Sequence, residues 1–313
     1  MENGTVDTAK DSKKGLLSNV THEKIRLALK QGRKMIKQVL KNPMGLIGVC
    51  ILVFFAFIAV FGPYLAPYTV NPEGVGQFDD LMPQSEEHIM GTDSFGFDIF
   101  SQLLYGARTS IIVGIFSAMI ASILGAMIGL YSGYAGGWKD EVIMRLNDIV
   151  LSIPWLVLMI IIAAFLGEIS LISIILIIGL TGWSGTARLV RSQVLSIKER
   201  QYIERARAIG SGDMHIIRRH ILPNSFPLVF ANTILTVAIS ILSEATLSFL
   251  GMRPIGVVTW GTMLSHAFSQ GAFHIGLHYW IIMPGLCIVF VVLGFTLLGY
   301  ALDEVMNPKL RKR

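Results

Sequence analysis

Long apolar stretches separated by short polar segments make up most of this chain. Six stretches are mostly apolar over about twenty residues, the length that a helix needs to cross roughly 30 Å of hydrocarbon at about 1.5 Å per residue. The expected transmembrane helices are residues 44–66, 109–132, 147–167, 169–187, 225–250 and 280–302. The pattern therefore predicts an all-α integral membrane protein with six transmembrane helices.

Composition agrees with this pattern. Hydrophobic residues make up 53% of the 313 positions and charged residues 15%, a balance that a soluble domain of this size cannot easily keep in solution. The first apolar run starts at Met44, is too long for a signal peptide and has no small-residue cleavage site after it, so we expect it to stay as an anchor. Cys50 and Cys287 fall inside predicted spans and are expected to be small packing residues.

The basic residues predict the orientation. With a cytoplasmic N-terminus, all of the 26 lysines and arginines except Arg108 and Arg253 lie on the inside, as the positive-inside rule requires. The net charge of +5 then reflects topology and attraction to anionic lipids, and nucleic acid need not be invoked as a partner. Both termini are therefore expected in the cytoplasm.

The segment before the first span is polar and basic. Residues 1–20 are expected to be a disordered cytoplasmic tail. Residues 21–43 place apolar side chains at helical spacing among lysines and arginines, which predicts an amphipathic helix on the inner membrane surface; an ordinary solvated helix is the alternative.

Several positions within the spans stand out. Span two carries rows of small residues, including Gly114, Gly125 and Gly129, which predict close helix packing at the centre of a bundle. Pro154 in span three removes a backbone hydrogen bond and can bend that helix. Glu244 lies about 20 residues from the inner end of span five, roughly 30 Å up, so we expect a hydrated group at a pathway mouth or a structural partner, with proton coupling as the alternative.

The sequence holds no recognisable catalytic machinery. No lysine is preceded by the glycine spacing of a P-loop, and neither a Ser/His/Asp arrangement in a familiar context nor a clustered set of metal ligands is present. His274 and His278 have i, i+4 spacing and can hold a metal if that segment is helical, although histidines at a membrane interface explain them as well. We expect a non-enzymatic protein that binds no cofactor itself.

A charged segment, residues 188–223, separates spans four and five. Residues 190–209 are expected to form a helix with a break near Ser196, Gly210-Ser211-Gly212 a turn, and 214–221 a second helix that Asp213 caps and Pro223 ends. This helix-turn-helix knuckle can be a DNA reader, an inert basic loop on lipid headgroups, or a docking element for a cytoplasmic partner. Its tethering at both ends close to lipid argues against entry into a DNA groove.

The knuckle resembles the EAA loop of ABC importer permeases, whose pattern is Glu-Ala-Ala, three residues, Gly, nine residues, Ile, any residue, Leu-Pro. The matching positions here are Glu204, Arg205, Ala206, Gly210, His220, Leu222 and Pro223. Arg205 replaces the first alanine, and His220 replaces the isoleucine. The resemblance implies that the knuckle couples the permease to its ATPases, with Glu204, Ala206 and Gly210 setting the docking geometry, Asp213 as cap and Pro223 as the fixed end of a lever.

Other segments between about 40 and 310 resemble the second, or "C", permease of dipeptide and oligopeptide importers. The matching residues are Gly91-Thr92-Asp93, Gly96, Asp98, Phe100-Ser101, Leu104-Tyr105-Gly106-Ala107-Arg108, Arg145, Asp148, Ile153-Pro154, Leu247-Ser248-Phe249-Leu250-Gly251 and Trp260-Gly261. Phe97 and Gln102 stand where that family has arginines. Asp148, Pro154 and Glu244 are candidate pathway or structural residues, and Trp260 and Gly261 are candidates for docking of a binding protein.

The resemblance implies a type I permease bundle that forms half of a translocation pathway in the plasma (inner) membrane of a bacterial or archaeal cell. Its parts are an extracytoplasmic loop at 67–107, a permease core at 108–302 and a cytoplasmic tail at 303–313. The implied partners are a homologous second permease, two ATPase subunits that hold ATP and Mg, an extracytoplasmic substrate-binding protein, and membrane lipids. Peptides are the expected cargo. A nickel or metal-chelate importer permease and a self-contained secondary transporter are the alternatives.

Overall fold

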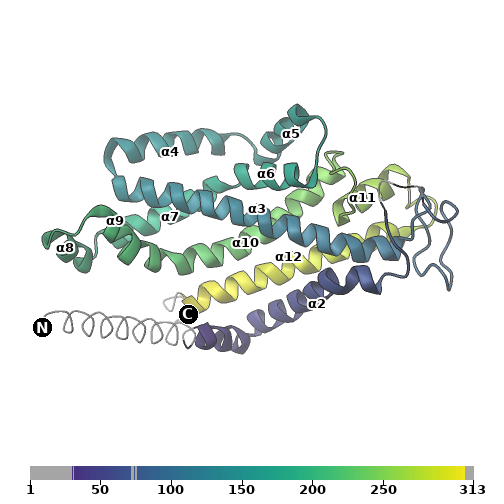
Figure 1. Ribbon diagram of the computed structural model, residues 1–313, viewed down its shortest axis with the longest axis horizontal. Helices are drawn as coiled ribbons and strands as arrows, with labels where there is room; N and C mark the ends of the chain where they lie inside the picture. Colours follow the sequence, from purple (N-terminus) through teal and green to yellow (C-terminus); the bar gives the residue numbers. More distant parts are fainter. Residues whose placement is uncertain (1–29, 31, 72–73, 75, 307–313) are drawn as a thin grey trace, which may run out of the picture.

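The computed structural model describes residues 30, 32–71, 74 and 76–306, which form an elongated bundle of helices (Figure 1). The helices are α2 (Pro43–Leu65), α3 (Ile99–Ala135), α4 (Gly137–Ser152), α5 (Trp155–Leu166), α6 (Leu171–Thr181), α7 (Trp183–Lys198), α8 (Gln201–Ala208), α9 (Asp213–Ile216), the π-helical turn η1 (Ile217–Ile221), α10 (Leu222–Phe249), α11 (Trp260–Ser269) and α12 (His278–Met306). The part of the chain described has no β-strand, only an isolated bridge between Thr92 and Asp98. The all-α prediction is confirmed.

Five helical segments among the described residues are long and apolar enough to cross a membrane. They are Pro43–Leu65, Ile99–Ala135, Leu171–Lys198, Asp213–Phe249 and His278–Met306, and a sixth span results if α4 and α5 are counted together. The second helix begins at Ile99 rather than near 109, inside the segment predicted as a loop. Asp98 explains the early start, because its carboxylate accepts hydrogen bonds from the backbone N–H and the hydroxyl of Ser101 at 2.8 and 2.7 Å and so caps the helix.

The third span is not the continuous helix predicted at 147–167. Helices α4 and α5 meet at an angle of 84°. Pro154 disfavours helical backbone at the preceding residue, and Ile153 accordingly adopts φ −86° and ψ 128°. Pro154 therefore breaks the span into two helices, where the sequence predicted only a bend, and α5 turns away from the bundle (Figure 1).

The central position predicted for the second span is confirmed by α3, which lies between α4 on one side and α10 and α12 on the other (Figure 1). Gly125, Gly129 and Gly133 let α3 approach α7 so closely that a Cβ atom at Gly129 would overlap the carbonyl oxygen of Ala187. Close backbone contact of this kind is how helices associate in lipid, where burial of apolar surface gives little driving force.

The ends of the chain lie only partly within the described residues. Residues 32–41 are helical, with Val39 packed against α10 and α12 and Ile36 exposed. Asn42 then caps α2. Its Nδ2 also donates a hydrogen bond to Glu304 Oε2 at 2.7 Å, which links the start of α2 to the end of α12. The predicted tail at 1–20, residues 21–29 and residues 307–313 lie outside the described part.

Helix α11 packs against α12, α10 and α3. Its His266 packs against Phe95, with ring centroids 5.4 Å apart. Burial, and to a lesser extent the positive charge of Arg253, lowers the pKa of His266 from its ordinary 6.5 to about 4. The imidazole is therefore neutral at pH 7 in the folded protein.

Acidification is expected to destabilise the bundle around α11. The pKa of His266 is lower in the folded state than in the unfolded state, so the unfolded state binds the proton more readily. The contribution of His266 to the free energy of unfolding is therefore fully present above about pH 6.5 and is lost as the pH falls toward 4. Thermal melting of the detergent-solubilised protein between pH 7.5 and 4.5 measures this loss. His266→Gln should flatten the pH dependence relative to His215→Gln, which changes an exposed histidine on α9; equal pH profiles for the two variants would contradict the assignment.

Candidate functional site: the knuckle between α7 and α10

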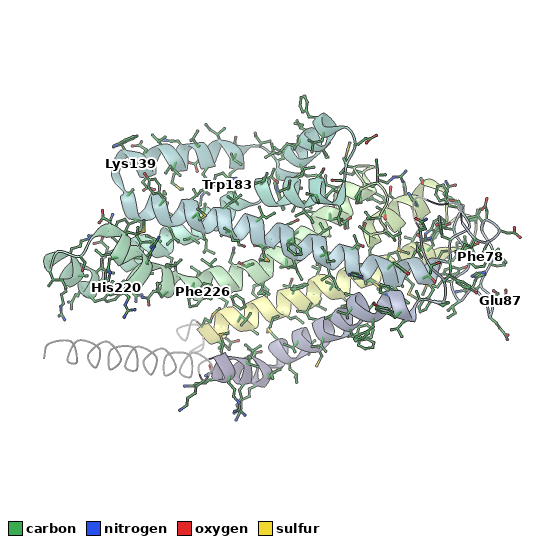
Figure 2. All side chains as sticks on the ribbon, in the orientation of Figure 1. Phe78, Glu87, Lys139, Trp183, His220 and Phe226 are labelled. Atoms are coloured by element: carbon green, nitrogen blue, oxygen red, sulfur yellow. The ribbon has the colours of Figure 1, made fainter. Side chains whose placement is uncertain are left out.

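The charged segment forms a compact knuckle made of α8, α9 and η1. It projects from one end of the bundle (Figure 1), opposite the irregular segment that carries Phe78 and Glu87 (Figure 2). Lys139 and His220 lie toward the knuckle end, and Trp183 lies between the two ends. The break after α7 falls at Glu199 and Arg200, three residues beyond the predicted position near Ser196.

A glycine turn joins α8 to α9. Gly210 has φ +82°, the left-handed conformation that only glycine adopts without strain. Around it, Gly210 N–H donates to Arg207 O at 2.9 Å and Ser211 N–H donates to Ala206 O at 3.0 Å, the two bonds of a Schellman motif. Gly212 has ordinary backbone angles, φ −67° and ψ 154°. The predicted turn is confirmed, and its conformational requirement rests on Gly210 alone.

Asp213 does not cap α9 as predicted. Gly212 is the N-cap residue, no side chain caps the helix, and Asp213 is its first residue. The Asp213 carboxylate instead accepts a hydrogen bond from the Tyr134 hydroxyl at 2.5 Å. The helix begins one residue earlier than predicted, so the extended N-cap residue is Gly212. The side chain of Asp213 is therefore free to reach the end of α3.

The knuckle has its own small hydrophobic core. Buried side chains from four elements meet there: Val190, Val194 and Ile197 on α7, Ile203 and Ala206 on α8, Ile216 on α9 and Ile221 on η1. Ala206 is 7% exposed, so its small side chain faces this core and lets α8 pack closely on the knuckle. The core makes the knuckle a stiff body rather than a loose loop.

The outer surface of the knuckle is both charged and apolar. Glu204 and Arg205 are exposed on α8. Beside the turn, Ile209 is 83% exposed and Met214 is 59% exposed. Large apolar side chains flanked by charges at a projecting tip are typical of a surface that a partner protein covers.

Pro223 does not end the second helix, which is a correction to the sequence prediction. The helix runs without interruption from Asp213 to Phe249 and includes Leu222 and Pro223. Proline has no N–H and its ring collides with the carbonyl four residues earlier in a regular α-helix. The π-helical turn Ile217–Ile221, closed by Leu222 N–H donating to Ile217 O, widens the helix at this point and accommodates the ring.

Two ion pairs join α4 to α7. Arg191 donates from Nε and Nη2 to the two carboxylate oxygens of Asp140, both at 2.6 Å, and the Ser132 hydroxyl also donates to Asp140. Arg188 donates to Asp148 at 2.6 Å, with both side chains about half exposed. Asp148, a candidate pathway or structural residue, therefore has a structural partner on α7.

Glu244 is wholly buried, so it is not the hydrated group predicted at a pathway mouth, and its hydrogen bonds agree with the structural alternative. Its Oε1 accepts hydrogen bonds from the hydroxyls of Ser248 at 2.8 Å and Thr259 at 2.7 Å, which fasten the connection between α10 and α11. The connection folds back over this part of α10 and excludes solvent, which the position of Glu244 along the span did not reveal. Oε2 has no partner among the described residues.

Trp260 and Gly261 are also buried, and this corrects their assignment as docking residues. Trp260 is 1% exposed and donates from Nε1 to Leu103 O at 3.1 Å. A Cβ atom at Gly261 would lie 2.9 Å from Ser248 Cβ, so this glycine allows α11 to pack on α10. Both residues build the interior of the bundle and present no side chain to a partner in this conformation.

The histidine pair with i, i+4 spacing is not on one helix. His274 lies in the turn before α12, and His278 is the first residue of that helix. Within the described part of the chain, no group of three or more His, Cys, Asp or Glu side chains is arranged to hold a metal ion.

Comparison with known proteins assigns the chain to a family. Residues 121–312, which include the knuckle, match the model of the binding-protein-dependent transport system inner membrane component, and residues 30–83 match the N-terminal transmembrane domain of oligopeptide transport permease C. The first match alone covers more than half of the chain. The chain belongs to the binding-protein-dependent transport permeases. It is thus a multi-pass membrane permease subunit of the ABC importer class and is not itself the catalytic subunit.

Full-length relatives support this assignment. The permease is 38% identical over 290 residues to a protein of Alkalihalophilus pseudofirmus described as the dipeptide transport system permease DppC, covering 91% of this chain and 92% of that one. It is 34% identical over 278 residues to the Bacillus subtilis protein of the same description, covering 88% and 85%. A glutathione transport system permease, GsiD of Pectobacterium atrosepticum, is 36% identical over 269 residues, covering 84% and 86%.

A solved structure shares the fold of the permease. A chain of the methionine ABC transporter MetNI, in an inward-facing conformation, superposes with a TM-score of 0.50 at 18% identity, covering 68% of this chain and 97% of that one. The type I importer permease fold predicted for the bundle is confirmed.

Sequence reasoning missed the residues that hold the knuckle of this permease in place. Tyr134, at the end of α3, bonds Asp213 through its hydroxyl and accepts from Lys198 Nζ at its carbonyl, 2.8 Å away. The guanidinium of Arg207 lies 5.7 Å from the centre of its ring. One signal was available, since Tyr134 is a polar aromatic residue just before the Gly136-Gly137 turn, but its partners lie more than sixty residues away in sequence.

Proposed function

We propose that this permease forms half of the translocation pathway of an ATP-driven peptide importer. A homologous permease completes the pathway, two ATPase subunits bind ATP and Mg and dock on the two knuckles, and an extracytoplasmic binding protein delivers the peptide. The knuckle lies in the cytoplasm, where ATP is available. Peptide cargo is supported by the descriptions of the relatives, which are dipeptide, oligopeptide and glutathione transport permeases.

The observation that carries the coupling role is the continuity of α9, η1 and α10. A helix of 37 residues begins at the exposed tip and runs through the bundle to Phe249. A partner that grips Glu204, Arg205, Ile209 and Met214 therefore pushes on a rod that reaches the other end of the protein. Closure of the ATPases around ATP shifts the bundle between inward-open and outward-open states through the different affinity of the ATPases for the two knuckle positions.

Reconstitution tests this function directly. The tagged permease should co-purify with a second permease and two P-loop subunits, and proteoliposomes holding the complex should take up a radiolabelled dipeptide only when ATP and the binding protein are both present. The permease alone should be inactive. Uptake by the permease alone, or uptake that continues without nucleotide, would establish a secondary transporter instead, and ATP-driven uptake of nickel but not of peptide would establish the metal alternative.

A further inference from the structure

A pocket of about 350 Å³ lies beside the break between α4 and α5, away from the knuckle. Its wall includes Asn232 and Ile239 of α10, which lie roughly 15 and 25 Å along that helix from its start at Leu222. The whole of α10 is 28 residues, or about 42 Å, long. The pocket therefore lies at the level of the middle of the membrane.

Two residues with hydrogen-bonding groups that lack partners contribute to the wall of this pocket. Ser184 lines the pocket, its side chain is almost wholly buried, and its hydroxyl has no hydrogen-bond partner among the described residues. Asn232 donates from Nδ2 to the Thr186 hydroxyl at 2.9 Å, and within the same described part its Oδ1 accepts no bond. A free hydroxyl and a free amide oxygen offer one donor and two kinds of acceptor to a ligand.

A further residue without hydrogen-bond partners, Asn147, is close in sequence to the pocket residues of α4. Asn147 is fully buried, and neither its amide oxygen nor its amide nitrogen has a partner in the part of the chain described. It precedes the pocket residues Val150 and Leu151 by three and four positions, so all three share one face of α4. A buried amide without partners is costly in a membrane, and Asn147 therefore adds a second polar group without partners, after the Ser184 hydroxyl, to this region of the bundle.

Most of the remaining wall is apolar, apart from the hydroxyls of Thr181, Thr186 and Thr236. Pro154 and Leu158 contribute hydrocarbon, and Trp155 donates from Nε1 to the Thr181 hydroxyl at 2.8 Å, which fixes its ring. None of the lining residues carries a charge. An uncharged wall with a few hydrogen-bonding groups suits a neutral amide and an apolar side chain, whereas a charged side chain entering it would lose hydration without compensation.

We propose that this pocket is a peptide-contact subsite within the membrane, an inference that rests on the proposed function. It receives one uncharged side chain of a peptide in passage, and Ser184 and Asn232 hydrogen-bond the adjacent backbone amide. The volume lies at the low end of small-molecule pockets, which span about 300–1,000 Å³, so the subsite holds one or two residues rather than a long segment. Weak, uncharged contact lets the peptide leave as readily as it enters.

Filling the pocket tests the subsite. Gly185 lines it, and a Cβ atom there would meet nothing within 4 Å, so Gly185→Leu is the substitution chosen to fill the space. Gly285 on α12 is equally free of neighbours and does not line the pocket, which makes Gly285→Leu the matched control. In proteoliposomes holding the complete complex and binding protein, the rate of ATP-driven uptake of radiolabelled trialanine should fall at least about tenfold for Gly185→Leu and by less than about twofold for Gly285→Leu.

Removal of the proposed hydrogen bond from Ser184 to the peptide tests the subsite through the KM for peptide uptake. Ser184→Ala should raise the KM for trialanine roughly two- to tenfold, the effect of losing one hydrogen bond, while the subunit stoichiometry of the purified complex matches that of the wild type. Uptake by Gly185→Leu equal to that of the control would assign the pocket to lipid and overturn the proposal. Loss of the second permease from purified Gly185→Leu would assign it to a subunit interface and overturn it likewise. A wild-type complex that carries no peptide would instead show that the proposed function has failed.

Discussion

Replacement of Gly210 by valine is expected to uncouple ATP hydrolysis from transport while the protein still inserts and assembles. The turn needs φ +82° at this position, and a residue with a Cβ atom pays about 1–2 kcal/mol there, with a β-branched side chain at the upper end or beyond. A cost of that size changes the population of the native turn roughly tenfold. Since the turn sets the angle between α8 and α9, its distortion displaces the docking surface relative to the rod formed by α10.

Gly212→Val is the control for this experiment. Gly212 is as open as Gly210, with no atom within 4 Å of an added Cβ, but its backbone angles suit any residue. ATP-driven peptide uptake and ATPase activity, measured on the same proteoliposomes, should show uptake reduced about tenfold or more for Gly210→Val and near wild type for Gly212→Val. Normal uptake by Gly210→Val would remove the argument for a rigid lever.

Gly129→Ala, on α3, is expected to destabilise the bundle. The loss should exceed that caused by a Gly→Ala substitution on α12 or at the knuckle. The new Cβ atom would overlap the carbonyl oxygen of Ala187 and lie 2.9 Å from Val190 Cβ. Because both neighbours belong to the backbone or to a β-branched side chain, neither can move aside without separating α3 from α7. Overpacking of this kind costs about 1–3 kcal/mol, and the apparent melting temperature of the solubilised protein should fall by several degrees.

Gly285→Ala provides the contrast. It adds the same methyl group to a membrane-spanning helix at a position with nothing within 4 Å. An alanine in a helix is favoured over glycine by about 1 kcal/mol, so this variant should melt at or slightly above the wild-type temperature. If Gly129→Ala and Gly285→Ala melt together, the close approach of α3 and α7 is not what holds the bundle.

The two glycines illustrate different physical demands on one residue type. Gly210 is exposed and needs only its backbone freedom, so its replacement is expected to affect coupling and leave the bundle intact. Gly129 sits in an ordinary helix and needs only its small size, so its replacement is expected to affect stability first. Measuring both transport and melting temperature on both variants separates these effects.

The helices and the turn of the knuckle could be predicted because they depend on residues that are close together in sequence. The sequence of charged residues around Gly210-Ser211-Gly212 predicted two helices and a turn, because turn chemistry and helical periodicity depend on neighbours in sequence. The roles of Asp213 and Pro223 were predicted wrongly for the same reason. Local rules make Asp213 a cap and Pro223 a stop, whereas the hydroxyl of Tyr134 and a π-helical turn decide otherwise.

Chain-wide apolar periodicity by itself determined that this is a helical membrane protein, where most spans lie and which segment protrudes, because the cost of placing polar backbone and charges in hydrocarbon leaves few other arrangements. The tertiary structure alone decided that Glu244 and Trp260 are interior residues, and that Ser184 and Asn232 lie in the wall of one pocket. Burial and hydrogen bonding are properties of pairs of segments far apart in sequence, and only the packing of α3, α7, α10 and α11 against one another brings those pairs together.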